Sequence, residues 1–456
     1  MMQLEDLKRF VIDVPRYTSY PTAAEFSTEV NAETHGRQLQ ARRAHGAGAL
    51  SLYVHLPFCA ELCHFCGCHA LIARTPERID RYLRALDGES ALVAGLLGEG
   101  RQVAELHFGG GSPSLLDADA FESVMNGLRS RFLFQSDAAL SLEADPRTTD
   151  AGKLARYRAL GIQRLSFGFQ GLDAGVQRAI GRNQSAAVSR AAFETARGLG
   201  FSGINIDLCY GLPEQNRATF ADTIETVVSL RPDRVALFGY AHVPWLKPRQ
   251  RLIDAAALPR TDLRLQLVSD AHARLTGAGY LPIGFDHFAL PEDPLARAAA
   301  GGTLHRNFQG YTTTGTDTLI GLGLSAISEL PGAYAQNARS LRDYYAAVDA
   351  GRLPTERGVL RSAEDRLRGD LIRRLMCEFR LNVPAIEARY QLSFPERFAN
   401  ELAALRALED DGLVSVARDT IELTPLGRLF VRNVAVVFDA HRRKPAPAAR
   451  RFSASV

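Results

Sequence analysis

The 456-residue sequence has few of the features that mark membrane, secreted or nucleic-acid-binding proteins. No apolar run approaches the roughly 18 residues of a membrane-spanning helix, and the N-terminal MMQLEDLKRF has no apolar stretch preceded by positive charge, so we expect neither a span nor a signal peptide. The net charge of +3 is spread along the chain, which argues against a nucleic-acid or membrane-surface partner. Long low-complexity tracts and coiled-coil heptads are also absent. The 46% hydrophobic and 23% charged content is typical of a soluble globular protein, and without coiled-coil heptads we expect a monomer in the cytoplasm.

Cysteine is scarce, yet four of the six cysteines lie within ten positions. They are Cys59, Cys63, Cys66 and Cys68, a C-x3-C-x2-C spacing followed by a fourth Cys. Without a secretory signal, this clustering fits a reducing cytoplasm better than a disulfide framework. Three interpretations are open: reduced cysteines in an ordinary loop, a structural zinc site, and an iron–sulfur cluster. Zinc sites usually use two separated knuckles, whereas Cys209 and Cys377 stand alone, so the pattern favours the cluster.

From residue 51 onward, short apolar or β-branched runs alternate with segments of helical periodicity. The runs lie at 51–56, 103–108, 139–143, 164–168, 203–208 and 234–239, and the helical segments at 76–97, 118–131, 151–160, 186–199, 217–230 and 259–278. This alternation predicts parallel βαβ units. Six units without a Rossmann fingerprint after the first strand favour an α/β fold with a partial or complete TIM-like (β/α) barrel, and a doubly wound sheet is the alternative.

The segments on either side of this barrel have a different character. Residues 1–50 form an arm that lies extended on the surface or covers a substrate pocket, followed by a helix at 29–46. Beyond a boundary near 355, helical patterns, a hairpin at 412–424 and a final helix at 426–438 resemble a winged-helix module. Its many acidic residues favour a lid or packing role over DNA binding. We therefore expect an arm at 1–50, a barrel domain at 51–355 and a small, mostly helical domain at 356–456.

Unusual residues follow the ends of the expected strands. In chain order they are the cysteine loop, Gly109-Gly110-Gly111-Ser112-Pro113, Glu143 with Asp145, Gln170, Asp207, and Ala241 with His242. The C-terminal strand ends form the face on which barrel active sites are built. Each feature alone has a structural explanation, since a glycine run makes a tight turn and an acid caps a helix. Their coincidence on one face predicts a single site.

The cysteine spacing, with the aromatic Phe65 before the third Cys, resembles the signature of the radical S-adenosylmethionine (SAM) superfamily. In that superfamily three Cys hold a [4Fe–4S] cluster whose open iron binds the amino and carboxylate groups of SAM. The polar residues suit such a ligand, because Glu143 and Asp207 accept hydrogen bonds from ribose hydroxyls or a cationic nitrogen. Gln170 and Arg182 can bind polar edges or the carboxylate, and the glycines permit close backbone approach.

Longer motifs resemble one family, the oxygen-independent coproporphyrinogen III oxidases (HemN type, or coproporphyrinogen dehydrogenases). They are PRYTSYPTA (15–23), SLYVHLPFC (51–59), HFGGGSP (107–113), NIDLCYGLP (205–213), HRNFQGYTT (305–313) and AQN (335–337). The resemblance covers essentially the whole chain. Haem-chaperone-like paralogues, which bind haem without oxidase activity, are the alternative, but they generally lack the tyrosine-rich arm and the fourth Cys.

The resemblance implies a set of cofactors and site residues. One [4Fe–4S] cluster would be held by Cys59, Cys63 and Cys66, and two SAM molecules would bind side by side. The first SAM would contact Tyr53, Gly110, Glu143 and Ile327. The second would contact Phe65, Gly111, Ser112, Gln170, Arg182, Asp207 and Ala241. Tyr53, His55 and Cys68 are further catalytic candidates, although spacing alone gives Cys68 no clear role.

The resemblance also implies a reaction. Electron transfer from the cluster cleaves SAM to methionine and a 5′-deoxyadenosyl radical, which takes a hydrogen atom from the β-carbon of a propionate of coproporphyrinogen III. Loss of CO2 and one electron leaves a vinyl group, and two such events give protoporphyrinogen IX. An electron donor and an electron acceptor, both unidentified, are required. Cationic and tyrosyl groups should bind the four propionates, and the candidates are Arg16, Tyr17, Tyr20, His55 and the 305–311 stretch with Gln309.

Overall fold

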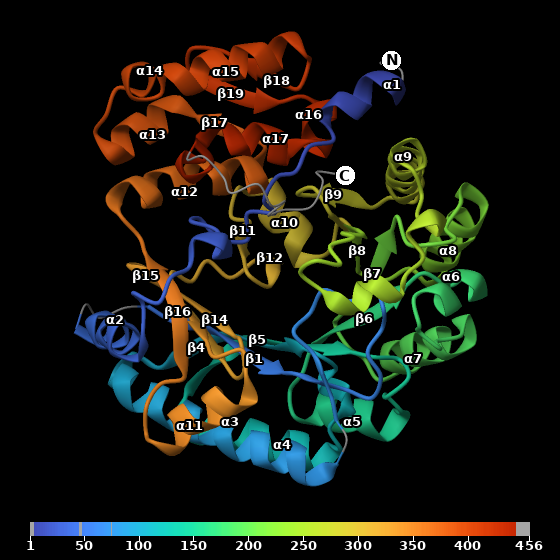
Figure 1. Cartoon of the computed structure of the whole chain (residues 1–456), viewed down its shortest axis with the longest axis vertical. Coiled ribbons are helices and arrows are strands. Elements are labelled where there is room, and N and C mark those ends of the chain that lie inside the picture. The colour runs from blue at the N-terminus through green and yellow to red at the C-terminus, as the bar shows by residue number, and fades with distance from the viewer. Residues whose placement is uncertain (1–3, 45–47, 74, 444–456) are drawn as a thin grey trace.

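The computed structural model describes residues 4–44, 48–73 and 75–443. Its centre is a 12-stranded sheet in the order β16-β15-β14-β13-β1-β4-β5-β6-β7-β8-β10-β9 (Figure 1). Seven neighbouring strands run parallel: β13 (Leu319–Leu322), β1 (Leu50–Leu56), β4 (Gln102–Gly110), β5 (Leu133–Ala144), β6 (Arg164–Gln170), β7 (Gly203–Tyr210) and β8 (Arg234–Gly239). The other five pair antiparallel: β9 (Leu281–Ile283), β10 (His287–Ala289), β14 (Ile327–Leu330), β15 (Ala333–Asn337) and β16 (Thr355–Leu360).

The predicted α/β fold is confirmed, and the barrel is the partial form. From β1 to β8 the strands follow one another in chain order, without the reversal that defines a doubly wound sheet, so that alternative is wrong. Within the described residues, the sheet ends at β16 on one side and β9 on the other, and it remains open. All six predicted strands are present, with β5 starting earlier than expected at Leu133.

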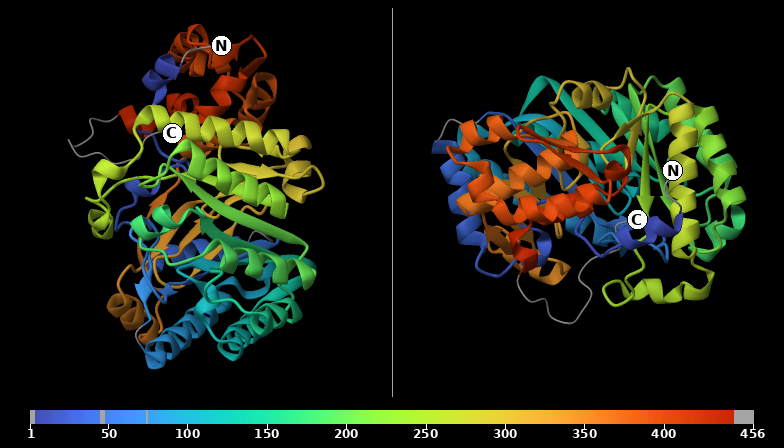
Figure 2. Two further views of the ribbon diagram at one scale, coloured as in Figure 1. Left: turned by 90° about the vertical axis from the view of Figure 1, so that its right-hand side faces the viewer. Right: turned by 90° about the horizontal axis from the view of Figure 1, so that it is seen from above.

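Helices cover the outer face of the parallel strands (Figures 1 and 2). They are α3 (Pro76–Leu97), α4 (Ala118–Arg131), α5 (Ala151–Ala159), α6 (Ala174–Ala179), α7 (Ala186–Gly198), α8 (Arg217–Leu230) and α9 (Thr261–Gly277). Five of them begin at side-chain caps, in which Asp117, Asp150, Asp173, Ser185 and Asn216 accept backbone N–H groups of the first turn. These caps explain why the sequence boundaries of the helices are so close to the observed ones.

Alternation along the strands decides which side chains reach the inner face. On β6, Leu165, Phe167 and Phe169 are buried, while the residues between them are only partly covered. Strand β7 repeats the pattern, with Ile206 and Leu208 buried on either side of Asp207. Because successive side chains of a strand point to opposite faces, the apolar residues pack against the helices and the polar ones face the hollow of the sheet.

The C-terminal segment, orange to red, lies at one end of the molecule (Figure 1). It contains α12 (Ala363–Glu378), α13 (Val383–Tyr390), α14 (Phe394–Arg397), α15 (Ala399–Asp410) and a small sheet of β17 (Arg380–Asn382), β19 (Thr420–Leu423) and β18 (Val414–Val416). The hairpin predicted at 412–424 is present as β18 and β19. The predicted boundary at 355 falls at the start of β16, a strand of the large sheet, and the division into domains stays a prediction.

The single final helix predicted at 426–438 is wrong. The segment forms α16 (Pro425–Leu429), α17 (Val431–Ala435) and a short 3-10 turn, Val436–Phe438. The break is at Phe430, where φ is −110° and ψ is 29°. Phe430 is buried and its ring lies 5.4 Å from that of Phe10, so packing against the arm replaces helical continuity there.

One of the two interpretations of the N-terminal arm, that it lies extended on the surface, is wrong. Tyr17 and Tyr20 are both buried. The Tyr17 hydroxyl donates to Asp439 at 2.9 Å, and the Tyr20 hydroxyl accepts the backbone N–H of Ala440 at 2.9 Å. The arm therefore packs under the C-terminal segment before leading to α2 (Ala32–Ala44). None of the helices in the described part of the chain combines the length and hydropathy that crossing a bilayer requires.

Candidate active site

The cysteine loop leaves the sheet at the C-terminal end of β1. Two short parallel strands, β2 (Phe58–Cys59) and β3 (Leu71–Ile72), close its base, and the N–H of Ala73 donates to the carbonyl of Cys59 at 3.1 Å. Within the loop Cys63 is buried, Cys59 and Cys66 are half-buried, and Cys68 is exposed. Because the loop starts and ends at one point, its cysteines are held close together above the sheet.

The three predicted cluster ligands act on one another electrostatically. Burial, followed by the charges of Cys66 and Cys63, raises the pKa of the Cys59 thiol to about 12. Hydrogen bonding by the Cys68 thiol lowers the pKa of Cys66, and the Cys68 N–H also lies 3.4 Å from Cys66 Sγ. Thiolates that repel one another this way are stabilised by a cationic group bound among them.

The donor set fits an iron–sulfur cluster better than a single ion. Among the described residues, no three Cys, His, Asp or Glu side chains are arranged to hold one metal ion. A [4Fe–4S] cluster is larger than a single ion, and each Cys thiolate binds a different iron, so the sulfur atoms need not converge on one point. Three mutually interacting thiols on one short loop are suited to such a cluster.

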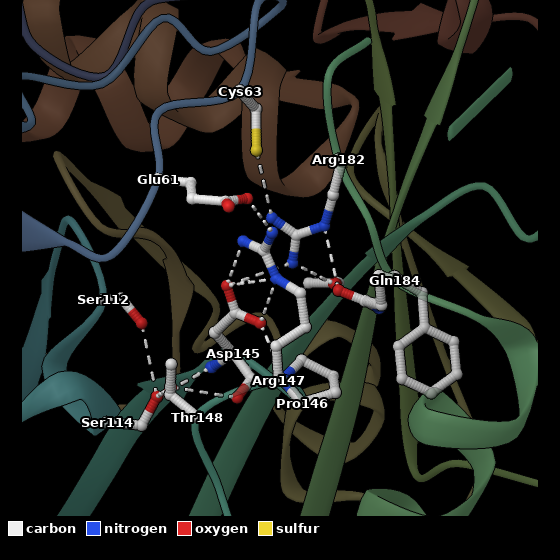
Figure 3. Close-up of polar contacts among 12 residues, drawn as sticks. Glu61, Cys63, Ser112, Ser114, Asp145, Pro146, Arg147, Thr148, Arg182 and Gln184 are labelled. Carbon is white, nitrogen blue, oxygen red and sulfur yellow. Dashed lines mark hydrogen bonds and ion pairs between the residues drawn. The ribbon is translucent and has the colours of Figure 1, made fainter. Parts of the chain in front are cut away.

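A network of charged side chains lies beside Cys63 and contacts the cysteine loop (Figure 3). Arg182 is only 7% exposed; its NH1 lies 3.5 Å from Cys63 Sγ and its NH2 lies 3.6 Å from Asp145 Oδ2. Asp145 also pairs with Arg147 at 2.7 Å, and Arg147 lies 3.5 Å from the Glu61 carboxylate in the loop. The Arg182 guanidinium is therefore held in place between the cysteine loop and the Asp145 carboxylate.

The glycine-rich loop after β4 lies directly against the cysteine loop. Gly110 has φ +118°, and a Cβ there would lie 2.6 Å from Cε1 of His55. A Cβ at Gly111 would lie 2.6 Å from the carbonyl carbon of Pro57. Gly110 is favoured by its positive φ and by the His55 ring of β1, and Gly111 is required because a side chain would push the glycine-rich loop away from the base of the cysteine loop.

Tyr53 and His55 project from β1 into the site. The Tyr53 hydroxyl lies 3.2 Å from His55 Nδ1, and His55 Nε2 lies 3.0 Å from the carbonyl oxygen of His69. A carbonyl only accepts, so Nε2 carries the hydrogen and Nδ1 accepts from Tyr53. Burial lowers the pKa of His55 to about 4, so the imidazole is neutral at neutral pH. The pair links β1 to the end of the cysteine loop.

Glu143 is the charged carboxylate at the end of β5. Its Oε2 accepts the N–H of Gly110 at 3.1 Å, and its Oε1 lies 3.3 Å from Nε2 of His107, whose ring stacks on Tyr53. Burial opposes ionisation, but the hydrogen bonds from His107 and Gly110 lower the pKa of Glu143 overall. With 42% of its side chain exposed, the carboxylate is available to a cationic or hydroxyl group of a ligand.

Asp207 presents a second carboxyl group, two strands away on the same face. It accepts hydrogen bonds from Ser166 at 3.0 Å and Asn205 at 2.7 Å. Burial and the charge of Glu143 raise the pKa of Asp207 to about 6. A cation bound beside this carboxyl group would stabilise its ionised form and offset the effect of burial.

Gln170 and Arg182 meet over the end of β6. Gln170 has φ +66°, a left-handed conformation that few non-glycine residues adopt. A Cβ at Gly168 would lie 2.8 Å from Nε2 of Gln170 and 3.4 Å from NH2 of Arg182. Because Gly168 has no side chain, the Gln170 amide and the Arg182 guanidinium can both pack against the end of β6.

Sequence reasoning missed Gln250, which joins two parts of the site. Gln250 is 1% exposed, and its Nε2 donates to the carbonyls of Phe65 at 2.9 Å and Ala241 at 3.1 Å. It thereby ties the cysteine loop to the loop after β8. A single Gln in a Pro- and Arg-rich segment carries no motif, so only its burial identifies it.

The remaining cofactor candidates lie at the rim of this face. Ser112 is buried, with its Oγ 3.3 Å from that of Ser114. Ile327 begins β14, next to Gly321, which stands opposite Tyr53 in the sheet register. A Cβ at Gly321 would lie 2.5 Å from the carbonyl oxygen of Ile327, so glycine lets these two strands come together there.

The substrate candidates separate into two groups. Arg16 donates to the carbonyl of Gly239 at 2.8 Å, and so reaches the end of β8. Gln309 lies in the turn between β11 (His305–Asn307) and β12 (Gly310–Thr312), and its buried Nε2 has no hydrogen-bond partner among the described residues. Tyr20, by contrast, turns its hydroxyl to the C-terminal segment, and the structure does not bring it to the site.

Comparisons with protein families agree with this arrangement. Residues 53–227 match the radical SAM superfamily, and residues 362–430 match the HemN C-terminal domain. Among curated proteins, the sequence is 43% identical over 440 residues to the oxygen-independent coproporphyrinogen III oxidase of Escherichia coli, covering 96% of this chain and 95% of that protein. The proteins of the same name from Synechocystis and Pseudomonas aeruginosa are 41% and 40% identical, over 96% and 98% of this chain and 94% and 97% of theirs.

Among solved structures, the chain resembles coproporphyrinogen III oxidase (HemN) from E. coli, described as a radical SAM enzyme. The TM-score is 0.90 at 43% identity, and the match covers 93% of this chain and 97% of that one. The likeness therefore spans nearly the whole length of both chains.

Proposed function

The chain belongs to the HemN-type family of oxygen-independent coproporphyrinogen III oxidases in the radical SAM superfamily, and we propose that it makes protoporphyrinogen IX in haem biosynthesis. Two propionate side chains of coproporphyrinogen III each lose one hydrogen atom, CO2 and one electron, and become vinyl groups. The observation that carries this proposal is the position of the three-cysteine loop. It stands over the ends of β4 to β7, where Glu143, Gln170 and Asp207 present their polar groups.

In this proposal Cys59, Cys63 and Cys66 hold the [4Fe–4S] cluster. When bound, the cluster and SAM supply the one-electron chemistry that removes hydrogen from the propionate β-carbon. Arg182 contacts Cys63 Sγ through NH1 at 3.5 Å and so supports this part of the loop. Gln250 fixes the position of the loop through the carbonyl of Phe65. These contacts hold the ligands in one geometry, which a radical reaction needs for regioselective attack.

Two SAM molecules are assigned to the polar face by the same proposal. Tyr53, Gly110, Glu143 and Ile327 line the first position, and Phe65, Gly111, Ser112, Gln170, Arg182, Asp207 and Ala241 line the second. At the first position, the ionised Glu143 accepts hydrogen bonds from an ammonium or from ribose hydroxyls. At the second, a cationic ligand beside Asp207 offsets the cost of ionising that carboxyl.

The number of electrons taken up and released determines which redox partners the reaction needs. Each SAM cleavage takes up one electron, and each decarboxylation releases one, so the enzyme requires an electron donor and an electron acceptor. Neither is identified by the residues described above. A monomeric state and a cytoplasmic location stay predictions.

The product assay separates this proposal from haem binding without catalysis. Protein reconstituted with iron and sulfide under argon is reduced with dithionite and then given SAM, coproporphyrinogen III and a one-electron acceptor, and the tetrapyrroles are separated by chromatography. We expect protoporphyrinogen IX, with methionine and 5′-deoxyadenosine. An iron-rich protein that retains haem but forms no vinyl product would overturn the proposal in favour of the haem-chaperone-like alternative.

A further inference from the structure

A cavity lies where four distant parts of the chain meet. The arm contributes Arg16, α9 contributes Arg264, the end of β8 contributes Gly239, and α17 contributes Arg432. Gly239 and the following residue line the cavity and lead directly to Ala241, a proposed SAM contact. The cavity therefore adjoins the proposed reaction site without sharing its polar face.

The residues that line the cavity carry more positive than negative charge. Among the described residues, the ionised side chains that line the cavity are Arg16, Arg264, Arg432 and Asp286, three cations against one anion. Arg432 is 5% exposed, and burial, followed by the charge of Arg16, lowers the pKa of its guanidinium to about 10. Asp286 lies 2.6 Å from Nδ1 of His287 and also feels the charge of Arg16, so this single anion offsets only part of the positive charge of the lining.

The rest of the lining is mostly apolar and aromatic. Leu237, Phe285 and Phe430 are among the residues that form its walls. Arg432 packs its guanidinium over the ring of Phe285 at 5.4 Å. A small inorganic anion would gain nothing from such walls. An organic carboxylate on a short alkyl arm would place its charge at the arginines and its methylene groups against the apolar surface.

We propose that this cavity binds the carboxylate of a substrate propionate that does not react, and so orients the macrocycle against the cofactors. The proposal rests on the proposed function, because it takes coproporphyrinogen III as the substrate. Each guanidinium already donates to a backbone carbonyl, Arg16 to Gly239, Arg264 to Tyr240 and Arg432 to Val14. These neutral carbonyls leave the like charges to repel one another across the cavity, and a bound carboxylate lowers that repulsion.

The test measures binding and not turnover. Coproporphyrin III, the stable oxidised macrocycle with the same four propionates, is titrated into the holoenzyme and followed by porphyrin fluorescence. Arg432→Met and Arg16→Met each remove one cation and keep an apolar stem of similar length. Arg249→Met, on the exposed loop after β8, makes the same change of charge outside the cavity. Binding of labelled SAM by equilibrium dialysis is measured for every variant.

We expect each cavity variant to bind coproporphyrin III about 10-fold to 100-fold more weakly, the loss of one charge-assisted hydrogen bond. Arg249→Met and all SAM affinities should stay within about threefold of the native protein. If Arg432→Met does not fold, as judged by circular dichroism, Arg16→Met decides the question alone. Unchanged porphyrin affinity in the folded variants, or weakened SAM binding in its place, would overturn the proposal.

This outcome is separable from that of the proposed function. A native enzyme that forms the vinyl product while Arg16→Met and Arg432→Met bind coproporphyrin III normally refutes the cavity assignment alone. A native enzyme that forms no vinyl product, yet loses porphyrin affinity in both variants, refutes the oxidase function and leaves a carboxylate site.

Discussion

Gly111→Ala tests how closely the glycine-rich loop supports the cysteine loop. The added Cβ would lie 2.6 Å from the carbonyl carbon of Pro57 and 2.8 Å from the carbonyl oxygen of Phe58, about 0.8 Å short of the 3.4 Å at which ordinary contact begins. Both neighbours are backbone atoms at the base of the cysteine loop, so the loop itself must move. Displacements approaching 1 Å cost on the order of 100-fold in rate, and overpacking costs about 1–3 kcal/mol of stability.

The matched control is Gly95→Ala, in the last turn of α3, where a Cβ would meet no atom within 4 Å. We expect Gly111→Ala to lower SAM cleavage by about 100-fold, while Gly95→Ala keeps the native rate and gains up to about 1 kcal/mol from helix propensity. The assay is 5′-deoxyadenosine formation by dithionite-reduced, reconstituted enzyme, with denaturant unfolding for stability. A Gly111→Ala enzyme that cleaves SAM within threefold of the native rate would refute the reasoning.

Three further substitutions give distinct outcomes. Cys63→Ala should abolish iron incorporation and SAM cleavage together, while the buried Cys377→Ala retains both; a full iron complement with normal activity would exclude Cys63 as a ligand. The pKa of Asp207 is raised to about 6, so its contribution to stability is present below its unfolded pKa and lost as pH rises. Relative to Asp207→Asn, the cofactor-free native protein should therefore lose about 2 kcal/mol between pH 4.5 and 7, measured by urea unfolding. Burial lowers the pKa of His35 to about 4, so protonation of this residue opposes folding and the pH dependence has the opposite sign. Relative to His35→Gln, the free energy of unfolding of the native protein should fall by about 2 kcal/mol from pH 7 to pH 5. The same change of stability with pH in both proteins would contradict this expectation.

The parallel core of the fold was predictable because its signals are local. Alternation on β6 and β7, and capping residues such as Asp117 and Ser185, are determined by a few neighbouring positions. The order of the strands then follows from short right-handed connections. The polar residues at the strand ends followed from the same frame, since parallel strands place their C-terminal ends on one edge.

Features that depend on distant segments were not predictable. The burial of Tyr17 depends on Asp439, more than 400 positions away, and the helix break at Phe430 depends on Phe10. Gln250 acts through two backbone carbonyls that no sequence pattern marks. The arginine-lined cavity is of the same kind, because its cations come from three separate parts of the chain.

The central claim is that this enzyme removes a hydrogen atom from the propionate β-carbon at the site under the cysteine loop. The direct measurement uses coproporphyrinogen III deuterated at those carbons, with mass spectrometry of the 5′-deoxyadenosine that is formed. We expect deuterium in the 5′-deoxyadenosine, and about two equivalents of 5′-deoxyadenosine per protoporphyrinogen IX, one for each propionate. Vinyl product accompanied by unlabelled 5′-deoxyadenosine would contradict hydrogen abstraction by the 5′-deoxyadenosyl radical.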